Sequence, residues 1–411
     1  METRDLGLTE DQIAMRRLVR DFVDEVVIPF VRDNRDREWC ASPEETFPLE
    51  LMLEADKIGL RALNVPEKYG GMSIDTMTTA IIVEELGRGD PGLSNTLTNC
   101  RKLAAYLGRH AAPRLQDEWF PRYMADPTFL MAMCNTEPKG ASDRALPYNV
   151  PEAAHQTKAV LEDGYWVING RKQFISNGYL GTLFIVHANT KPECGIVQGT
   201  STILVPRDTP GFQVTRANEK MGRRFCINGE MSFEDCRVPE DHVLVRDKAT
   251  EQARTYRTTA AISESAQALG VAQAAFDDTA KHVQEVFQGG RTIIKHQIVA
   301  IRLAEMATRI EAMRSFLYTV ARGIDSGASD AQNLRLMLKV FNCENSFEVC
   351  KAAVELHGGS GVMREVGVEK HLRDATVALH TEGTIDMHLF KIINSMFPDT
   401  VGAYAGPVNA A

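Results

Sequence analysis

Residues 158–178, KAVLEDGYWVINGRKQFISNG, differ in pattern from the chain on either side of them. Apolar residues here form short runs, and Asp163-Gly164 and Asn169-Gly170 are dipeptides that favour tight hairpin turns. The run at 201–206, followed by Thr209-Pro210-Gly211, indicates another strand and turn. These signals predict a β domain in the middle of the chain.

The sequence before this β region has a helical period. Thr9 is suited to cap the N-terminus of a first helix. A break that contains proline and two glycines, residues 65–71, precedes a second apolar helix at 76–86. The apolar face expected for the first helix consists of Leu8, Ile13, Leu18, Val19, Phe22, Val23, Val26 and Val27.

Long helical patterns return after Pro239. They cover residues 260–286, 296–323 and 330–356, and a last helix passes through Leu389 to Met396. Glycine-containing segments separate these helices. The expected fold is therefore α+β and mainly α, with an N-terminal helical domain at 1–129, a central β domain at 130–240 and a C-terminal helical bundle at 241–411.

Composition excludes several classes of protein. A chain of 411 residues can bury a large core, and its net charge of −9 argues against sequence-independent binding to nucleic acid, which needs a basic face. The apolar stretches are too short to cross a bilayer, and the first five residues, METRD, do not resemble a targeting peptide. We therefore expect a cytoplasmic protein without membrane contact.

The cysteines and the common motifs exclude further chemistry. Eight cysteines form no CxxC pair and show no spacing typical of zinc ligands, so we expect reduced, mostly buried thiols and no metal. Cys343 and Cys350 are two helical turns apart and are expected in the core. The patterns GxGxxG after a strand, GxxxxGK[ST], HExxH and GxSxG are missing, which excludes the usual nicotinamide, P-loop, zincin and hydrolase sites.

Two segments, TEPKGASD at 136–143 and HTEGT at 380–384, are rich in small and polar residues. At these places the hydrophobic periodicity predicts neither the exposed face of a helix or strand nor a simple turn. Glu382 lies at a break between helical patterns, beside Gly383, whose missing side chain lets backbone approach a ligand. A carboxylate buried against apolar groups gains basicity, so Glu382 is a candidate general base. The alternative is a helix N-cap or a surface glutamate.

Four separated motifs, TEPKGASD, KQFISNG, MREVGVEKHLRDA and TEGT, follow one another along the helical, β, helical order. In these motifs and their order the chain resembles the acyl-CoA dehydrogenase family, from about Leu8 to Met396. The resemblance implies FAD as cofactor. It also implies a C-terminal four-helix bundle through which subunits associate into a homotetramer.

The resemblance gives Glu382 the role of catalytic base. It matches the glutamate of the family's usual Tyr-Glu-Gly-Thr, with Thr381 in place of the tyrosine.

Five residues match family positions around the flavin ring. Asn135 and Thr136 match residues that bind its pyrimidine edge, and Ser142 matches the serine beside the flavin and the thioester arm of CoA. Phe174 and Ser176 stand where a tryptophan packs on the ring and a threonine hydrogen-bonds to it. Both replacements keep the type of side chain, aromatic and hydroxyl.

Other residues match positions along the rest of the cofactor. Gly358, Gly359 and Gly361 match a glycine turn that meets the pyrophosphate of a neighbouring subunit, although the same turn also suits a helix C-terminus. Thr384 and Asp386 follow the base toward the adenine half, and the family usually has an amide or a glutamate where Asp386 stands.

The chain departs from the family at the contact between subunits. Val286 and Gly289 stand where the family has an arginine and a phenylalanine against the cofactor. Arg291 and Gln297 are the matching polar residues that remain. Whether Arg291 replaces the missing arginine is left open.

The substrate side carries three candidates. Arg101 lies near the helical segment that lines the acyl end of the family's pocket, where a buried arginine could pair with a substrate carboxylate; the alternative is a solvated arginine at a helix end. The family's substrate-contacting arginine aligns with Ala261, and Arg257 lies one helical turn earlier. Some members of the family carry their catalytic base on this helix, at the position that aligns with Ala260. Glu264 is the only other candidate base on the same helix face.

The implied reaction is α,β-dehydrogenation of an acyl-CoA. The base removes the α-proton while flavin N5 takes the β-hydride, and the electrons pass on to an electron-transfer flavoprotein. An acyl-CoA oxidase or a desulfinase-like relative of the same fold stays open as an alternative, as does a non-catalytic nucleic-acid-binding relative. The acidic balance and the retained Glu382 speak against the last of these.

Overall fold

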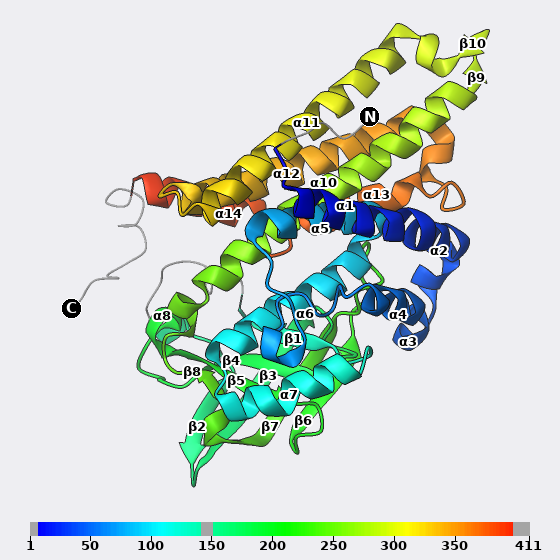
Figure 1. Ribbon diagram of the computed structural model, residues 1–411. Coiled ribbons are helices and arrows are strands. Elements are labelled where there is room, and N and C mark those ends of the chain that lie inside the picture. The colour runs from blue at the N-terminus through cyan, green and yellow to red at the C-terminus, as the bar shows by residue number, and fades with distance from the viewer. Residues whose placement is uncertain (1–6, 141–150, 398–411) are drawn as a thin grey trace.

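The computed structural model describes residues 7–140 and 151–397, and Figure 1 shows helices at the start of the chain, a sheet below them and long helices above. The first region is helical, and a π-helical segment, Val23–Val27, joins its first two helices. Its helices are α1 (Glu10–Phe22), α2 (Ile28–Asp33), α3 (Pro43–Thr46), α4 (Leu49–Lys57), α5 (Thr76–Gly89), α6 (Pro91–His110) and α7 (Pro113–Ala125).

The middle region is an eight-stranded sheet. Seven of its strands follow the order β6-β7-β3-β2-β4-β5-β8, and the eighth, β1, pairs parallel with β4. The short helix α8 (Ile196–Gly199) lies between β4 and β5. The strands are β1 (Met131–Cys134), β2 (Lys158–Glu162), β3 (Tyr165–Ile175), β4 (Leu183–Asn189), β5 (Thr200–Pro206), β6 (Phe212–Ala217), β7 (Gly229–Pro239) and β8 (Val243–Val245).

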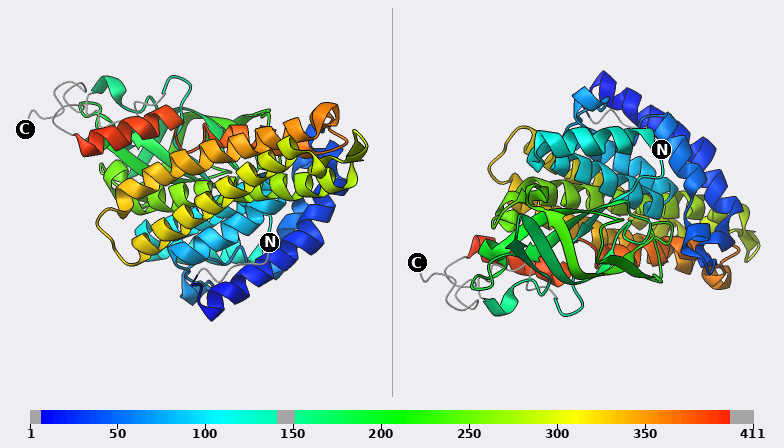
Figure 2. Two further views of the ribbon diagram at one scale, coloured as in Figure 1. Left: turned by 90° about the horizontal axis from the view of Figure 1, so that it is seen from above. Right: turned by 90° about the horizontal axis from the view of Figure 1, so that it is seen from below.

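The last region is again helical, and its three longest helices run side by side, as the left view of Figure 2 shows. A two-stranded hairpin, β9 (Phe287–Gln288) and β10 (Arg291–Thr292), joins the first two of them. The helices are α9 (Ala249–Gln252), α10 (Arg254–Glu285), α11 (Gln297–Asp325), α12 (Ala331–Leu356), α13 (Val368–Ala378) and α14 (Ile385–Met396). The expected order of helices, sheet and helices is thus confirmed.

Two glycines bring α5 of the first region against α10 of the last. A Cβ added at Gly270 would lie 2.2 Å from the carbonyl oxygen of Glu84, and one at Gly87 would lie 2.7 Å from that of Gln267. The two helix backbones therefore touch, which only glycine permits. This contact sets α5 and its successor α6 beside α10, where the candidate site lies.

Most of the local predictions agree with the structure. Thr9 caps α1, since its side chain accepts a hydrogen bond from the backbone N–H of Gln12. Asp163-Gly164 forms the tight turn between β2 and β3, with φ of +50° and +79°. All eight cysteines are free thiols, and Cys343 and Cys350 are fully buried in α12, as expected of core residues.

The prediction of a turn at Asn169-Gly170 is wrong. Both residues lie inside β3, where the pairing with β7 shifts register between Ile168 and Gly170. Gly170 has φ +148°, and a Cβ there would come within 2.6 Å of Thr157 Oγ1. A glycine is needed here because a neighbouring segment approaches the backbone closely at a β-bulge, and not because the chain turns.

The apolar face expected for α1 is wrong at two positions. Ile13 and Leu18 are 43% and 40% exposed, whereas Arg16 is buried on the face that meets α5. Arg16 pairs with Glu85 at 2.9 Å, so this contact is built partly from charges, and hydrophobicity alone does not locate it. The helix α13 and the hairpin of β9 and β10 were also not among the predicted elements.

Candidate functional site

Glu382 lies in the loop between α13 and α14 and has a left-handed backbone, with φ +53°. Such a conformation is uncommon for a residue other than glycine, asparagine or aspartate, so the surrounding structure must hold it. Two side chains do so: Lys339 Nζ donates to the carbonyl oxygen of Gly383 at 2.9 Å, and His388 Nε2 lies 3.1 Å from that of Glu382. Gly383 follows at φ +106°.

His388, in the first turn of α14, is held uncharged. Burial, together with the ammonium groups of Lys339 and Lys391, lowers the pKa of His388 to about 3. A neutral ring can donate through Nε2 to the carbonyl of Glu382. His388 therefore adds no charge of its own to the two lysines, Lys102 and Lys339, that contact this loop.

The carboxylate of Glu382 meets a buried lysine. Lys102 Nζ of α6 donates to Glu382 Oε1 at 2.8 Å, and the lysine side chain is 3% exposed against 34% for the glutamate. Burial works to lower the pKa of Lys102, but the Glu382 carboxylate, together with Tyr256 and Glu264, outweighs burial, and the pKa of Lys102 is raised. The ring of Tyr256 lies 5.1 Å from the same ammonium. Lys102 is therefore charged and forms an ion pair with the candidate base.

Glu382 borders a small cavity between α5, α6 and α10. Its volume is about 10 Å³, roughly the room of one water molecule, so a ligand can enter only if side chains move. Most of the lining is polar. The lining residues are Val83, Asn95, Thr98, Lys102, Ala260, Ser263, Glu264, Gln267 and Glu382.

Glu264, the fallback base, faces the same cavity but is fully engaged. Arg223 donates to both of its oxygens, at 2.6 and 3.0 Å. Burial works to raise the pKa of Glu264, yet Arg223, together with Lys339 and a hydrogen bond from Thr381, outweighs burial and lowers that pKa. This carboxylate is less suited than Glu382 to accept a proton.

Arg101 is buried, 4% exposed, so the alternative of a solvated helix-end arginine is wrong. Its guanidinium donates to the hydroxyls of Thr79 at 2.8 Å and Ser263 at 3.4 Å. Within residues 7–140 and 151–397 it has no carboxylate partner, and burial lowers the pKa of Arg101 to about 10. Arg257, on α10, is exposed and does not line the cavity.

The residues expected around the flavin ring lie together at the ends of β1 and β3. Asn135 and Thr136 directly follow β1, and the carbonyl oxygen of Thr136 accepts from the N–H of Gln173 in β3. Phe174 has φ +60° and is 56% exposed. Ser176 Oγ accepts from Asn95, which also lines the cavity beside Glu382. Ser142 lies outside the described residues.

Thr384 and Asp386 line an open groove on the other side of the Glu382 loop. The groove has a volume of about 660 Å³ and runs between α11, α12 and the start of α14. Thr384 also caps α14, where its side chain accepts from the N–H of Met387.

The remaining expected cofactor residues lie elsewhere in the chain. Arg291 and Gln297 are exposed at the β9–β10 end of the long helices, whereas α14 lies at their opposite end in Figure 1. The turn Gly358–Val362 follows α12 and adjoins α10, since the rings of His357 and His282 stack at 3.9 Å. A single chain therefore does not bring these residues to Glu382.

Sequence reasoning missed the residues that hold the base. Lys102, Lys339 and His388 carry no motif, and each lies in a helix remote from the others in sequence. The one available signal was Arg101-Lys102, two adjacent cations in an otherwise apolar and hydroxyl-rich helix. Among the described residues, no cluster suited to hold a metal ion is found, and no helix has the length and apolar character needed to span a membrane.

Comparison with known proteins covers almost the whole chain. The family domains described as Acyl-CoA dehydrogenase, N-terminal domain, middle domain and C-terminal domain match residues 9–126, 132–236 and 253–397. Cyclohex-1-ene-1-carbonyl-CoA dehydrogenase of Geobacter metallireducens is 32% identical over 92% of this chain and 95% of its own length.

Solved structures show the same fold. One comes from the work "Electron transferring flavoprotein of Acidaminococcus fermentans: Towards a mechanism of flavin-based electron bifurcation", with 29% identity, a TM-score of 0.85 and coverage of 96% of this chain and 100% of that one. Another, "PigA with FAD and proline", has 25% identity, a TM-score of 0.85 and coverage of 95% and 99%. The chain belongs to the acyl-CoA dehydrogenase family.

Proposed function

We propose that this protein is an FAD-dependent acyl-CoA dehydrogenase that converts a CoA thioester to the enoyl-CoA, with Glu382 as the base that takes the α-proton. The observation that carries the proposal is Glu382 itself, held at φ +53° by Lys339 and His388 and directed at a cavity beside the end of the sheet. Strained residues that their surroundings hold in place often belong to active sites, and a carboxylate at a cavity can act as a general base.

The residues present fit FAD. An exposed aromatic side chain, Phe174, and the hydroxyl of Ser176 stand at the strand ends next to Asn135 and Thr136, where a flat ring can pack and hydrogen-bond. The solved relative PigA holds FAD on this fold. FAD supplies the acceptor for the β-hydride when it is bound.

The glycine turn also fits, as a surface for a phosphate. At Gly358, φ is +60° and no atom lies within 4 Å of the point where a Cβ would stand, so the backbone is open to a ligand. Because this turn, Arg291 and Gln297 lie far from Glu382 in one chain, they would meet the cofactor of a neighbouring subunit. This placement supports a homo-oligomer, which we propose is a tetramer.

The protein's own groups then carry the proton chemistry. Glu382 accepts the α-proton, and its backbone N–H, which has no acceptor among the described residues, can donate to the thioester carbonyl oxygen as charge builds there. Gly383 leaves room for the thioester beside this backbone. The 10 Å³ cavity implies that the acyl group displaces part of its lining and excludes water.

We propose that the electrons pass to an electron-transferring flavoprotein. A protein of this kind is the subject of the Acidaminococcus fermentans work from which one of the similar structures comes. A cytoplasmic location is proposed with it. An oxidase or a desulfinase-like activity would use the same base and differ in the fate of the electrons or of the leaving group. A nucleic-acid-binding role is disfavoured by the net charge of −9.

Anaerobic bleaching of the bound flavin by a panel of CoA thioesters tests the proposal. Glu382→Gln should keep fold and cofactor while turnover falls about 10²- to 10⁴-fold, because an amide fills the same space and accepts no proton. Glu264→Gln tests the other carboxylate of the cavity. Full activity in Glu382→Gln together with loss in Glu264→Gln would move the base to α10, and a protein that cannot be loaded with FAD would refute the proposal.

A further inference from the structure

Two consecutive residues of α6 carry buried positive charge to the candidate site. Lys102 and Arg101 are 5% and 4% exposed. The lysine lines the cavity beside Glu382, and the guanidinium of Arg101 reaches the hydroxyl of Ser263, another lining residue. On the α6 side the cavity thus has a cationic wall formed by Lys102, and the Arg101 guanidinium lies behind Ser263.

Lys102 has a satisfactory partner only while Glu382 is ionised. When Glu382 takes up the substrate proton, its carboxylate becomes neutral, and the ammonium 2.8 Å away loses its counter-ion. A buried charge without a partner is strongly unfavourable. Unless a second anion is present, Lys102 therefore opposes the proton transfer that Glu382 has to perform.

Arg101 has no counter-ion even before the reaction. Its contacts to Thr79 at 2.8 Å and Ser263 at 3.4 Å are to neutral hydroxyls, and no carboxylate of the described residues pairs with it. Elsewhere in the fold buried arginines do have carboxylate partners, for example Arg223 with Glu264 and Arg314 with Glu84. A buried guanidinium held only by hydroxyls suits an anion that arrives with a ligand.

We propose that the acyl group this site takes carries a carboxylate, which pairs with Lys102 and Arg101 on the α6 wall as the substrate displaces the lysine from Glu382. The inference rests on the proposed function and names its substrate class, a short dicarboxylic acid bound to CoA through one carboxyl group. The arriving carboxylate frees the base and keeps Lys102 paired after Glu382 is protonated.

The distances limit the length of the acid. A base oxygen stands about 3 to 3.5 Å from the carbon that it deprotonates, and Lys102 Nζ is 2.8 Å from that oxygen. Before it is displaced, the ammonium is therefore roughly 6 Å at most from the position of the α-carbon, and the lysine turns from this position to meet the arriving carboxylate. A carboxylate oxygen three or four bonds along the acyl chain reaches it, which corresponds to a succinyl or a glutaryl group. The polar lining of the cavity agrees with a charged acid better than with a fatty acyl chain.

Calorimetric titration of the FAD-loaded enzyme with matched thioesters tests this inference. Glutaryl-CoA and succinyl-CoA are compared with their terminal amides, which keep size and shape and remove only the charge. The wild type should bind each acid at least tenfold more tightly than its amide, the usual effect of a hydrogen bond to a charged group. Equal binding of acid and amide would overturn the proposal.

Variants of α6 show which residues read the charge. Arg101→Met and Lys102→Met should each reduce the preference for the acid tenfold or more, and Arg101→Lys should retain part of it. Lys57→Met, which removes an exposed cation of α4, should leave the preference unchanged and is the control. Circular dichroism confirms that each variant is folded. A preference that survives in both Arg101→Met and Lys102→Met would place the charge recognition elsewhere and overturn the assignment.

Flavin bleaching, measured on the same samples, separates this inference from the proposed function. If neutral thioesters bleach the flavin as well as the acids do, dehydrogenation stands and the carboxylate preference fails. If the acids bind preferentially but no thioester bleaches the flavin, the charge recognition stands and the proposed reaction fails.

Discussion

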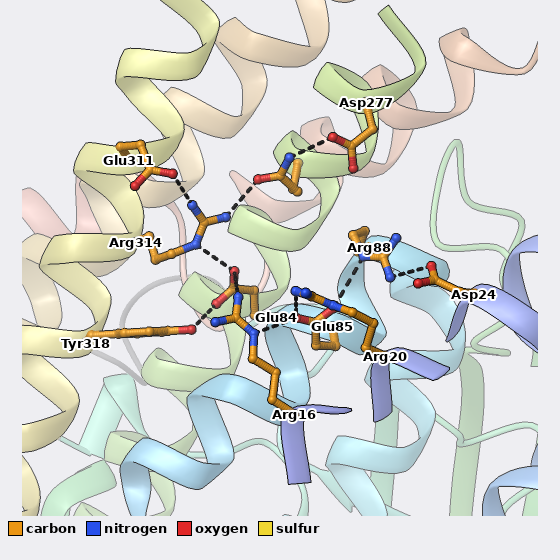
Figure 3. A network of polar contacts seen from close by, with 11 residues as sticks. Arg16, Arg20, Asp24, Glu84, Glu85, Arg88, Asp277, Glu311, Arg314 and Tyr318 are labelled. Carbon is orange, nitrogen blue, oxygen red and sulfur yellow. Dashed lines mark hydrogen bonds and ion pairs between the residues drawn. The ribbon is translucent and has the colours of Figure 1, made fainter. Parts of the chain in front are cut away.

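Between α1, α5 and α11, buried arginines and carboxylates pair with one another, whereas α6 brings cations to the candidate site that have fewer acidic partners. Figure 3 shows the first group, here called the interface network. Glu85 accepts from Arg16 at 2.9 Å and Arg20 at 2.5 Å, and Glu84 accepts from Arg314 at 2.9 Å. The network consists of Arg16, Arg20, Asp24, Glu84, Glu85, Arg88, Gln273, Asp277, Glu311, Arg314 and Tyr318.

Every arginine of the interface network has a carboxylate partner, and Tyr318 donates its hydroxyl to Glu84 at 2.6 Å. The second group, here called the site cluster, is uneven. Its cations outnumber its carboxylates, and among the described residues Arg101 and Lys339 pair with none. The cluster consists of Arg101, Lys102, Arg223, Lys339, Glu264 and Glu382.

The difference in charge pairing between the two groups indicates which buried charges stabilise the fold and which bind a ligand. Charges that hold elements together are satisfied within the protein, because an unpaired buried charge reduces stability. Charges that serve a ligand are satisfied only when it binds, so the free protein carries a deficit there. Measurements of stability should therefore give opposite results in the two groups.

The largest effect is expected in the interface network. Glu85→Gln removes the carboxylate shared by Arg16 and Arg20 and leaves their charges in a buried contact. Breaking such a pair typically costs about 3 kcal/mol in the free energy of unfolding. Denaturant unfolding of the FAD-loaded protein measures this loss. Glu50→Gln, which removes an exposed carboxylate paired with Arg37, is the control and should change stability by less than about 1 kcal/mol. A loss in Glu85→Gln no greater than in the control would remove the distinction drawn between the two groups.

The sequence predicted the architecture well, because its signals are local. The cap at Thr9, the turn at Asp163-Gly164 and the long helical periods each depend on residues close together in the chain. The failures came from contacts between distant segments. Gly170 is required by Thr157 across the sheet, and Arg16 is buried because Glu85 meets it from another helix.

The candidate site divides in the same way. Glu382 and the residues at the strand ends were identified through motifs, whereas Lys102 was not, because its importance depends on a residue 280 positions away. The sequence allowed Arg101 to be either a buried partner of a substrate carboxylate or a solvated arginine at a helix end. The packing of α6 against α5 and α10 shows that Arg101 is buried. Charge balance is a property of three-dimensional contacts, so no linear pattern records it.

A second effect is expected from the burial of His388 and from the lysines beside it. Its pKa of about 3 in the folded protein is below the ordinary value, so between pH 6.5 and 3 the unfolded chain binds a proton that the folded chain refuses. The free energy of unfolding should therefore fall as the pH is lowered through this window. His388→Gln keeps a donor for the carbonyl of Glu382 and should lose this part of the acid sensitivity.

Comparison of unfolding at pH 7.5 and pH 5 measures the effect of His388. The loss of stability on acidification should be smaller in His388→Gln than in the wild type. His380→Gln, an exposed histidine of the loop between α13 and α14, is the matched control and should behave as the wild type does. An identical acid dependence in wild type and His388→Gln would show that the ring is protonated in the folded state, contrary to the charge pattern of the site cluster.

The smallest change in stability, and the sharpest contrast with Glu85, is expected at Arg101. In Arg101→Met the long side chain still fills its place between α5 and α10, while a guanidinium that has no counter-ion is removed. Replacing a buried charge by an apolar group of similar volume is often neutral or stabilising. We therefore expect the free energy of unfolding of the unliganded protein to stay within about 1 kcal/mol of the wild type or to rise. Denaturant unfolding is measured without and with glutaryl-CoA, on the wild type and on the variant. The thioester should stabilise the wild type more than the variant, because a ligand that binds more tightly adds more to the free energy of unfolding. A loss of several kcal/mol in Arg101→Met without ligand, comparable with that of Glu85→Gln, would mean that Arg101 is a structural charge like those of the interface network.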